Sequence, residues 1–374
     1  ENIDIGGPSM IRSAAKNHRF VTVIVDPADY EVVLKEMREA RGETSLETRY
    51  YLASKAFALT ARYDGAISNY LSSFKESKES EEFPGTLTLQ FSKRQDLRYG
   101  ENPHQRAAFY VEPAGDEPTV ANAVCHQGKE LSFNNILDAD GALNLVKEFQ
   151  APTAVIIKHT NPCGAATGGA SLLDAYRRAQ QTDPVSAFGG IVAFNRQVDE
   201  AVAEELAKTF LEAIIAPGYT EGARRVLATK KNLRVLETPW PAHFERQGFE
   251  LKKVAGGLLV QERDNVLYER PRIKVVTKRA PTEREFDDLT FAWTICKHVK
   301  SNAIVYVHGG QLVGVGAGQM SRVDSVRIAR DKARLPTQGA VMASDAFFPF
   351  RDGLDEAAKA GIKAVIQPGG SMRD

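Results

Sequence analysis

The stretch of sequence that decides the fold is Ala154-Val155-Ile156-Ile157, which runs directly into Lys158-His159-Thr160-Asn161-Pro162-Cys163-Gly164. Four apolar residues that end at a polar turn predict a short, buried β-strand. Further helices and strands are predicted in alternation after it: a helix from Ser171 to about Gln180, a strand at 191–194, a helix from Val198 to about Leu211 and a strand at Ile214-Ile215. Strands that alternate with helices of this length indicate a layered α/β fold.

A similar pattern occurs twice along the chain. Ser186-Ala187-Phe188 and the stretches 198–201 and 213–218 are matched by Ser344-Asp345-Ala346-Phe347 and the stretches 354–357 and 364–369. Each copy follows an apolar strand, at 154–157 and at 303–306. We therefore expect two similar α/β halves with a site between them, and a chance likeness of strand–helix–strand units is the alternative.

The N-terminal part of the chain predicts both strands and helices. The β-branched run 21–25 ends at Asp26-Pro27 and predicts a buried strand, whereas Ser45 is the expected start of a helix that runs to about Leu71. The charged tract 75–82 has no apolar residue, which indicates a linker or a solvated loop. Beyond it, residues 86–91 alternate with a period of two, as a half-buried strand does.

Composition excludes several classes of protein. The chain has 374 residues, which suggests two or three domains, and its 48 Lys and Arg residues balance its 48 Asp and Glu residues. No global charge therefore attracts nucleic acid or an anionic membrane, and no apolar run approaches the roughly 18 residues of a membrane span. The three cysteines lie far apart in the sequence, so a disulfide framework is not expected and a reducing cytoplasm fits best.

Lys158 and His159 lie at the predicted exit of a strand, where open α/β sheets bind their ligands. An imidazole exchanges a proton near neutral pH, and an ammonium group stabilises a developing anion. Asn161-Pro162 favours a turn that would hold these side chains over the strand end. We expect an active site here, and a surface Lys-His pair in a polar loop is the alternative.

Two further segments have the composition of an anion site. Arg98 begins Arg98-Tyr99-Gly100-Glu101-Asn102-Pro103-His104-Gln105 after a strand, and Arg322 follows three glycines in the stretch 314–322. Glycines let the backbone approach a phosphate, and a guanidinium binds a phosphate or carboxylate with two hydrogen bonds. The glycine spacing does not match the dinucleotide-binding fingerprint. Plain tight turns are the alternative at both places.

Two single residues in the second copy are further candidate site residues. Asn302 precedes the strand, where a neutral amide can orient a carbonyl or an amine, although a turn residue would look the same. Phe347 belongs to a cluster with Phe348 and Phe350 that can stack on a heteroaromatic ring, although the core is the expected place for most of these rings.

Near the N-terminus, Asp4 and Lys16 flank Gly6-Gly7. A carboxylate and an amine across a glycine-rich turn suit an acid/base pair. Ordinary surface residues are the default interpretation of such a pair.

Pro162-Cys163 matches one part of the signature of zinc-dependent deaminases. That signature needs a second Cys three positions later and an upstream His-x-Glu, whereas this chain has Ala166 and no His-x-Glu before Pro162. Because a catalytic zinc needs three protein ligands, no metal is expected at Cys163, and packing is its expected role.

Together these motifs resemble the family of bifunctional purine biosynthesis proteins, in which phosphoribosylaminoimidazolecarboxamide formyltransferase is joined to IMP cyclohydrolase. The resemblance covers essentially the whole chain and rests on long motifs at 98–105, 158–164, 186–190, 316–322 and 343–352. It implies an α/β fold with two tandem cytidine-deaminase-like α/β/α halves without zinc, preceded by the tail of a smaller, methylglyoxal-synthase-like α/β domain.

The resemblance also implies a domain organisation. Residues 1–74 would be the end of the cyclohydrolase domain with its connecting helices, and residues 75–84 a linker. Residues 85–374 would be the transformylase domain, with repeated halves at roughly 85–225 and 280–374.

The family transfers a formyl group from 10-formyltetrahydrofolate to the 5-amino group of 5-aminoimidazole-4-carboxamide ribonucleotide (AICAR), which gives FAICAR. His159 matches the family's proton-transfer histidine, Lys158 its partner lysine, and Asn302 a residue that positions the reacting groups. The matches to nucleotide-binding positions are Arg98, Tyr99, Gly189, Glu212, Arg322 and Phe347, with Asp352 at a folate-side position and Asp4 and Lys16 at cyclohydrolase positions. Glu212 stands where the family carries Asp, a modest departure.

The resemblance also implies the oligomeric state, location and partners of the protein. It implies a cytoplasmic homodimer with transformylase sites at the subunit interface, without nucleic-acid or membrane partners and without a catalytic metal. By the same analogy, a structural monovalent cation would lie near Cys296, Ser301 and Asp345.

The resemblance also implies that family members continue beyond Asp374 with site residues, and that half of the cyclohydrolase site would precede Glu1. We therefore expect no cyclohydrolase activity from this chain, weak nucleotide binding, and slow formyl transfer or none. The alternative functions are a nucleotide-binding scaffold without catalysis and a deaminase-like hydrolase.

Overall fold

The computed structural model describes residues 2–74, 79–113, 115–169 and 171–370. It consists of two compact units, Glu1–Ser92 and Lys93–Asp374. The predicted linker at 75–84 lies within the first unit, and its residues 75–78 lie outside the described residues. The assignment of the two units to two enzymatic domains stays a prediction.

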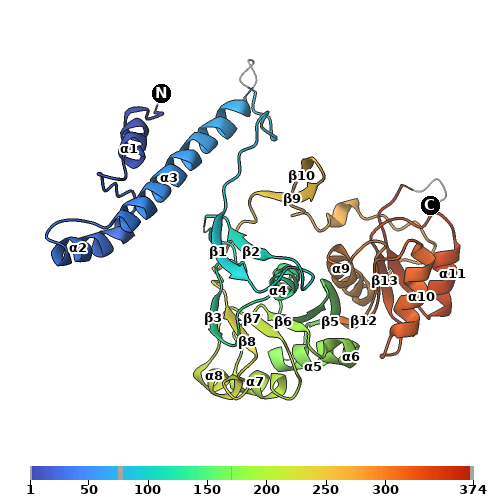
Figure 1. Cartoon of the computed structure of the whole chain (residues 1–374). Helices are drawn as coiled ribbons and strands as arrows, with labels where there is room; N and C mark the ends of the chain where they lie inside the picture. Colours follow the sequence, from blue (N-terminus) through green and yellow to red (C-terminus); the bar gives the residue numbers. More distant parts are fainter. Residues whose placement is uncertain (1, 75–78, 114, 170, 371–374) are drawn as a thin grey trace. The chain divides into compact units, whose positions relative to one another are not determined.

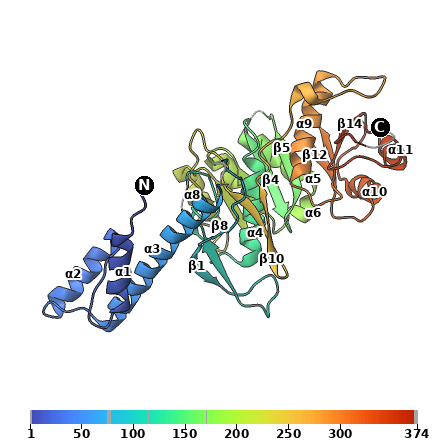
Figure 2. The same cartoon turned by 90° about the horizontal axis from the view of Figure 1, so that it is seen from above.

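The first unit is built on one long helix, α3, against which α1 packs (Figure 2). Its helical elements are α1 (Gly6–Lys16), a 3-10 turn (Pro27–Asp29), α2 (Tyr30–Glu39) and α3 (Leu46–Ser72). The Ser45 hydroxyl accepts a hydrogen bond from Thr48 N at 3.1 Å and caps α3, which confirms the predicted helix start. In the described ranges, no helix combines the length and apolar character that a membrane span requires.

Two strands predicted in this unit are wrong. Residues 21–25 form no strand, and Val23 and Val25 pack against the small alanine cluster between α1 and α3. Residues 86–91 run along α3, where Thr88 exchanges two hydrogen bonds with Asn69, at 2.7 and 2.8 Å. An alternating or β-branched pattern predicts an extended chain, but it does not supply the neighbouring strand that must pair with it.

The second unit contains, within its described residues, a ten-stranded sheet in the order β14-β13-β11-β12-β5-β4-β6-β7-β8-β3 (Figure 1). Its strands are β3 (Val124–Gln127), β4 (Thr153–Lys158), β5 (Asn161–Thr167), β6 (Ile191–Phe194), β7 (Ala213–Ala216), β8 (Arg234–Glu237), β11 (Ile304–His308), β12 (Gln311–Gly316), β13 (Val341–Ser344) and β14 (Ala364–Ile366). Two pairs stand apart from it: β1 (Ser92–Leu97) with β2 (Ala107–Val111), and β9 (Phe249–Val254) with β10 (Gly257–Glu262).

Helices cover both faces of this sheet (Figures 1 and 2). They are α4 (Phe133–Val146), α5 (Leu172–Thr182), α6 (Pro184–Ala187), α7 (Glu200–Leu206), α8 (Glu221–Leu227), α9 (Glu283–Lys297), α10 (Arg322–Lys332) and α11 (Asp352–Lys359), with a 3-10 turn at Arg270–Arg272. The prediction of an α/β fold is confirmed, since a large sheet lies between layers of helices. The likeness of each half to cytidine deaminases stays a prediction.

One arrangement of strands occurs twice in the sheet. β4 pairs antiparallel with β5 and β6, and β6 pairs parallel with β7. In the same way β11 pairs antiparallel with β12 and β13, and β13 pairs parallel with β14. Ala154 pairs with Phe194 in the first copy as Ile304 pairs with Ser344 in the second. The sequence-based match of Ser186 with Ser344 is therefore wrong, because Ser186 precedes β6 whereas Ser344 ends β13.

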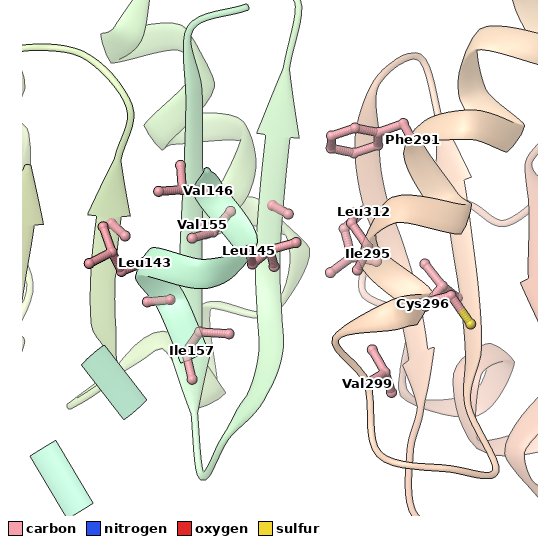
Figure 3. Packing of buried hydrophobic residues seen from close by; sticks show 14 of the residues in the cluster. Leu143, Leu145, Val146, Val155, Ile157, Phe291, Ile295, Cys296, Val299 and Leu312 are labelled. Atoms are coloured by element: carbon pink, nitrogen blue, oxygen red, sulfur yellow. The ribbon is translucent and has the colours of Figure 1, made fainter. Parts of the chain in front are cut away.

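The two copies share one core on one face of the sheet. α4 and α9 enclose a single cluster of buried apolar residues that extends across both copies. In this cluster Leu145 of α4 lies toward Ile295 of α9 and Leu312 of β12 (Figure 3). On the other face the core divides into one cluster under α5, α7 and α8 and another under α10 and α11. Main-chain pairing of Ala166 with Gln311 joins the copies at β5 and β12.

A buried ion-pair network ties the two copies to the segment before β9. Glu148 Oε1 accepts hydrogen bonds from Arg246 at 2.6 Å, Lys297 at 3.1 Å and His298 at 3.3 Å, and the Glu148 side chain is only 7% exposed. Burial alone would raise the pKa of Glu148, but the bonds from His298 and Arg246 lower it to about 2. The carboxylate is therefore charged throughout the neutral range.

Glu148→Gln should lower the free energy of unfolding at neutral pH by about 3 kcal/mol, because buried cations lose their counter-charge. The folded-state pKa lies below the ordinary value of 4.5, so this stabilisation is full above pH 4.5 and is lost as the pH falls toward 2. Urea unfolding at neutral pH and near pH 3.5 measures both effects, and the difference between wild type and variant should be smaller at the lower pH.

The matched control is Glu221→Gln, which removes an exposed pair with Arg225. An exposed pair contributes under about 1 kcal/mol, so this variant should unfold almost like the wild type. Equal losses in Glu148→Gln and Glu221→Gln would contradict a special role for the buried network.

Candidate active site

The candidate site begins at the turn between β4 and β5. Lys158 ends β4, and His159 and Thr160 form the turn with left-handed backbone at φ 51° and 60°. The His159 side chain is exposed and Lys158 is half-buried, so neither lies in an apolar interior. The structure places this predicted pair at a strand exit, with the imidazole accessible to a ligand.

Two polar side chains hold this turn through hydrogen bonds to its main chain. Asp138 of α4 accepts hydrogen bonds from His159 N at 3.1 Å and from Thr160 N at 2.7 Å. Asn161 donates to His159 O at 3.1 Å and accepts from Lys300 N at 3.1 Å. Because Lys300 lies two residues before Asn302, Asn161 links the turn of the first copy to the predicted site residues of the second.

The Lys158 ammonium group is oriented by the backbone of Gly189. Its Nζ donates to Gly189 O at 2.8 Å. Gly189 has φ 68°, and a Cβ atom there would lie 3.2 Å from Lys158 Nζ, so glycine both allows this backbone and leaves room for the ammonium group. An ammonium group has three N–H donors, so two remain for a ligand.

Glu212 lies beside the same backbone segment. Its N–H donates to Gly190 O at 3.1 Å, and its carboxylate forms an ion pair with Arg234 at 2.8 Å. The first group of predicted residues therefore consists of Lys158, His159, Gly189 and Glu212.

The second group lines a pocket of about 540 Å³. Four predicted residues contribute to it: Asn302, Arg322, Phe347 and Asp352. Phe348 and Phe350 also line the pocket. Phe350 is exposed, like Phe347, whereas Phe348 is 6% exposed and belongs to the core. The expectation that most of these rings lie in the core is therefore wrong.

Arg322 is held by neighbours within the pocket. Its Nη2 donates to Asn302 Oδ1 at 2.6 Å, and its Nη1 donates to Ser344 Oγ at 2.9 Å and to Asp345. Burial would raise the pKa of Asp345, but the bonds from Ser301 and Arg322 keep it below its ordinary value. These contacts use three of the five N–H groups of the guanidinium, so two are left for a ligand.

Asn302 is oriented by the same contacts. Its Nδ2 donates to Gln319 O at 2.9 Å while its Oδ1 accepts from Arg322. Both ends of the amide are therefore fixed, which suits a residue that positions a substrate.

Arg98 and Tyr99 follow β1 and form a group of their own. The Arg98 guanidinium lies 5.9 Å from the centroid of the Tyr99 ring. Among the described residues, no hydrogen bond or ion pair joins either of them to the turn or the pocket. Their place in the site stays a prediction.

Asp4 and Lys16 lie at opposite ends of α1 in the first unit. Asp4 accepts a hydrogen bond from Gly7 N at 3.1 Å, and its N–H donates to Tyr63 Oη at 2.7 Å. The helix between them is about 16 Å long, so they do not form the direct acid/base pair that the sequence suggested.

Cys163 has the environment of a packing residue. Its Sγ lies 3.5 Å from Ile156 O, and burial raises the pKa of the thiol to about 12. The described ranges contain no group of three His, Cys, Asp or Glu side chains placed to hold a metal ion.

The predicted cation position lies around Ala303. Cys296 Sγ donates to Ala303 O at 3.6 Å, and Asp345 accepts from Ala303 N at 2.9 Å. A monovalent cation at this place stays a prediction.

Comparison with known proteins settles the family. A family model described as the AICARFT/IMPCHase bienzyme matches residues 14–332. The chain belongs to this bienzyme family. The bifunctional purine biosynthesis protein PurH of Magnetococcus marinus is 58% identical over 386 residues, an alignment that covers all of this chain and 73% of that relative. The resemblance inferred from the motifs is confirmed.

The candidate site is composite. The imidazole and the ammonium group come from the first copy of the repeat, and the guanidinium, the fixed amide and the aromatic rings come from the second. The hydrogen bond between Asn161 and Lys300 brings the two sets to the same edge of the sheet. Sequence motifs identified both sets, but they gave no sign of Asp138.

Proposed function

We propose that the chain transfers a formyl group from 10-formyltetrahydrofolate to the 5-amino group of AICAR. This is one of the two activities of a bienzyme of purine biosynthesis, and the other closes FAICAR to IMP. Beyond the family match, the observation that carries the proposal is the link from the Lys158-His159 turn through Asn161 to the pocket of Asn302 and Arg322. Formyl transfer to a nucleotide needs a base and an anion-binding group close to one another.

The chemistry requires a base because the 5-amino group is a weak nucleophile, with its lone pair delocalised into the ring and the carboxamide. His159 accepts a proton from this nitrogen as it attacks the formyl carbon. A tetrahedral intermediate forms, and the free N–H groups of Lys158 stabilise its oxyanion. The bond from the formyl carbon to N10 then breaks, and the His159 imidazolium returns the proton to N10, which leaves as tetrahydrofolate.

The pocket of the second copy binds the nucleotide. The two free N–H groups of Arg322 suit the nucleotide phosphate, and the exposed rings of Phe347 and Phe350 offer faces for stacking. Asn302 orients the reacting groups through its fixed amide, and Asp352 at the start of α11 lies on the folate side. A cytoplasmic homodimer with sites at its interface belongs to the same proposal.

The test is a formyl-transfer assay on this chain and on a version extended at both ends to the length of its relatives, with calorimetric titration of AICAR alongside. We expect transfer in the extended form at least, with AICAR bound by both. AICAR binding without transfer in either form would indicate a nucleotide-binding scaffold. Release of ammonia from AICAR would indicate a deaminase-like hydrolase instead.

A further inference from the structure

Both copies of the repeat contain the same turn, held by the same kind of residue. Asp138 accepts hydrogen bonds from two successive N–H groups, those of His159 and Thr160. Asp288 of α9 accepts from Gly309 N at 2.8 Å and Gly310 N at 2.7 Å, between β11 and β12. α4 and α9 also begin alike, each with a capping box, at Ser132 and Thr282. The two aspartates are therefore structural counterparts.

The two turns differ in strain. The backbone is left-handed in both, with φ 51° and 60° at His159 and Thr160, and φ 58° and 68° at Gly309 and Gly310. Glycine adopts this conformation freely, whereas it destabilises other residues by about 1–2 kcal/mol each. The first turn keeps two residues with side chains where its counterpart has two glycines, and such strain persists only where surrounding contacts fix the backbone.

We propose that Asp138 is a positioning residue for formyl transfer. Its carboxylate fixes the strained backbone of His159 and Thr160, and so sets the direction in which the imidazole leaves the turn. It acts on main-chain N–H groups and needs no contact with substrate. Asn161 also supports this turn, through its bond to His159 O. This inference rests on the proposed role of His159.

The experiment compares Asp138→Asn with Asp288→Asn in the same protein. An amide oxygen can accept one of the two N–H groups, but the amide NH₂ opposes the other, so each variant loosens its own turn. We expect Asp138→Asn to lower kcat by roughly ten- to a hundredfold, with KM for AICAR changed by less than about twofold, because misplacement of a catalytic group costs rate. Asp288→Asn should leave kcat almost unchanged. It should nevertheless lower the melting temperature by about as much as Asp138→Asn does, because each variant loses a hydrogen bond to its turn.

Two further measurements distinguish a role of Asp138 in positioning His159 from a general effect on folding. Amide hydrogen exchange should become faster in the peptide that contains residues 159–160 for Asp138→Asn, and in the peptide that contains 309–310 for Asp288→Asn. Adding Thr160→Gly to Asp138→Asn should restore part of the lost kcat, because glycine needs no support at that φ.

Equal losses of kcat in the two Asn variants would overturn the proposal, and so would faster exchange in Asp138→Asn with an unchanged kcat. All kinetic measurements use the protein extended to the length of its relatives, and absence of formyl transfer in that extended wild type would reject the proposed function. In that case the exchange measurement still decides whether Asp138 holds the turn.

Discussion

His159→Ala should lower kcat for formyl transfer by roughly 10²- to 10⁴-fold, the range typical of a lost general base. The dissociation constant of AICAR should change little, because the exposed imidazole lies on the turn while the pocket that we propose for the phosphate is built from the second copy. Steady-state kinetics and calorimetric titration of AICAR measure the two quantities separately. Added imidazole should restore part of the rate.

The matched control is His308→Ala. His308 is exposed and ends β11, directly before the glycine turn of the second copy. Its removal should leave kcat and AICAR binding unchanged. If His159→Ala weakens AICAR binding as much as it lowers kcat, the residue holds the nucleotide and is not the base.

Arg322→Ala should raise the dissociation constant of AICAR by roughly 10²-fold or more, because each charge-assisted hydrogen bond contributes about 1.5–3 kcal/mol. A second effect follows from the contacts of Arg322 with Asn302 and Asp345. Without the guanidinium, the Asn302 amide loses one of its two anchors and the Asp345 carboxylate loses its ion-pair partner. We therefore expect kcat to fall as well, although by less than in His159→Ala.

The AICAR riboside, which lacks the phosphate, tests directly whether Arg322 contacts the phosphate. Wild type and Arg322→Ala should bind the AICAR riboside about equally if the lost contact is to the phosphate. An equal loss of affinity for nucleotide and riboside would reject the phosphate assignment. Arg330→Ala, on the same helix but paired with Glu356, is the control and should leave AICAR binding unchanged.

Much of the second unit can be predicted from local sequence. β4 and β6 follow from short apolar runs, and α5 from the cap at Ser171, because buried strands and capped helices leave a signal within a few residues. The order of the strands leaves no such signal. β5 and β12 lie side by side although about 150 residues separate them, and the core shared under α4 and α9 supports that pairing without leaving a local signal.

The sequence offered candidate site residues next to strands and glycine-rich turns, whereas it gave no sign of Asp138. Lys158 and His159 follow an apolar run, and Arg322 follows a glycine-rich turn. Asp138 lies inside a helix some twenty residues before the turn that it holds, without a local motif. An alignment of the two copies in the register of the structure matches Asp138 with Asp288. The sequence-based match of Ser186 with Ser344 has a different register and therefore does not show this correspondence.

The continuous core under both copies limits how the enzyme can close on its substrates. A hinge motion of one copy against the other would have to break the pairing of β5 with β12 and open the apolar core that α4 and α9 share. Within the second unit, we therefore expect enclosure of the reactants to come from surface loops, such as the one that carries Met320 and the one that carries Phe350, whose side chains are 97% and 62% exposed.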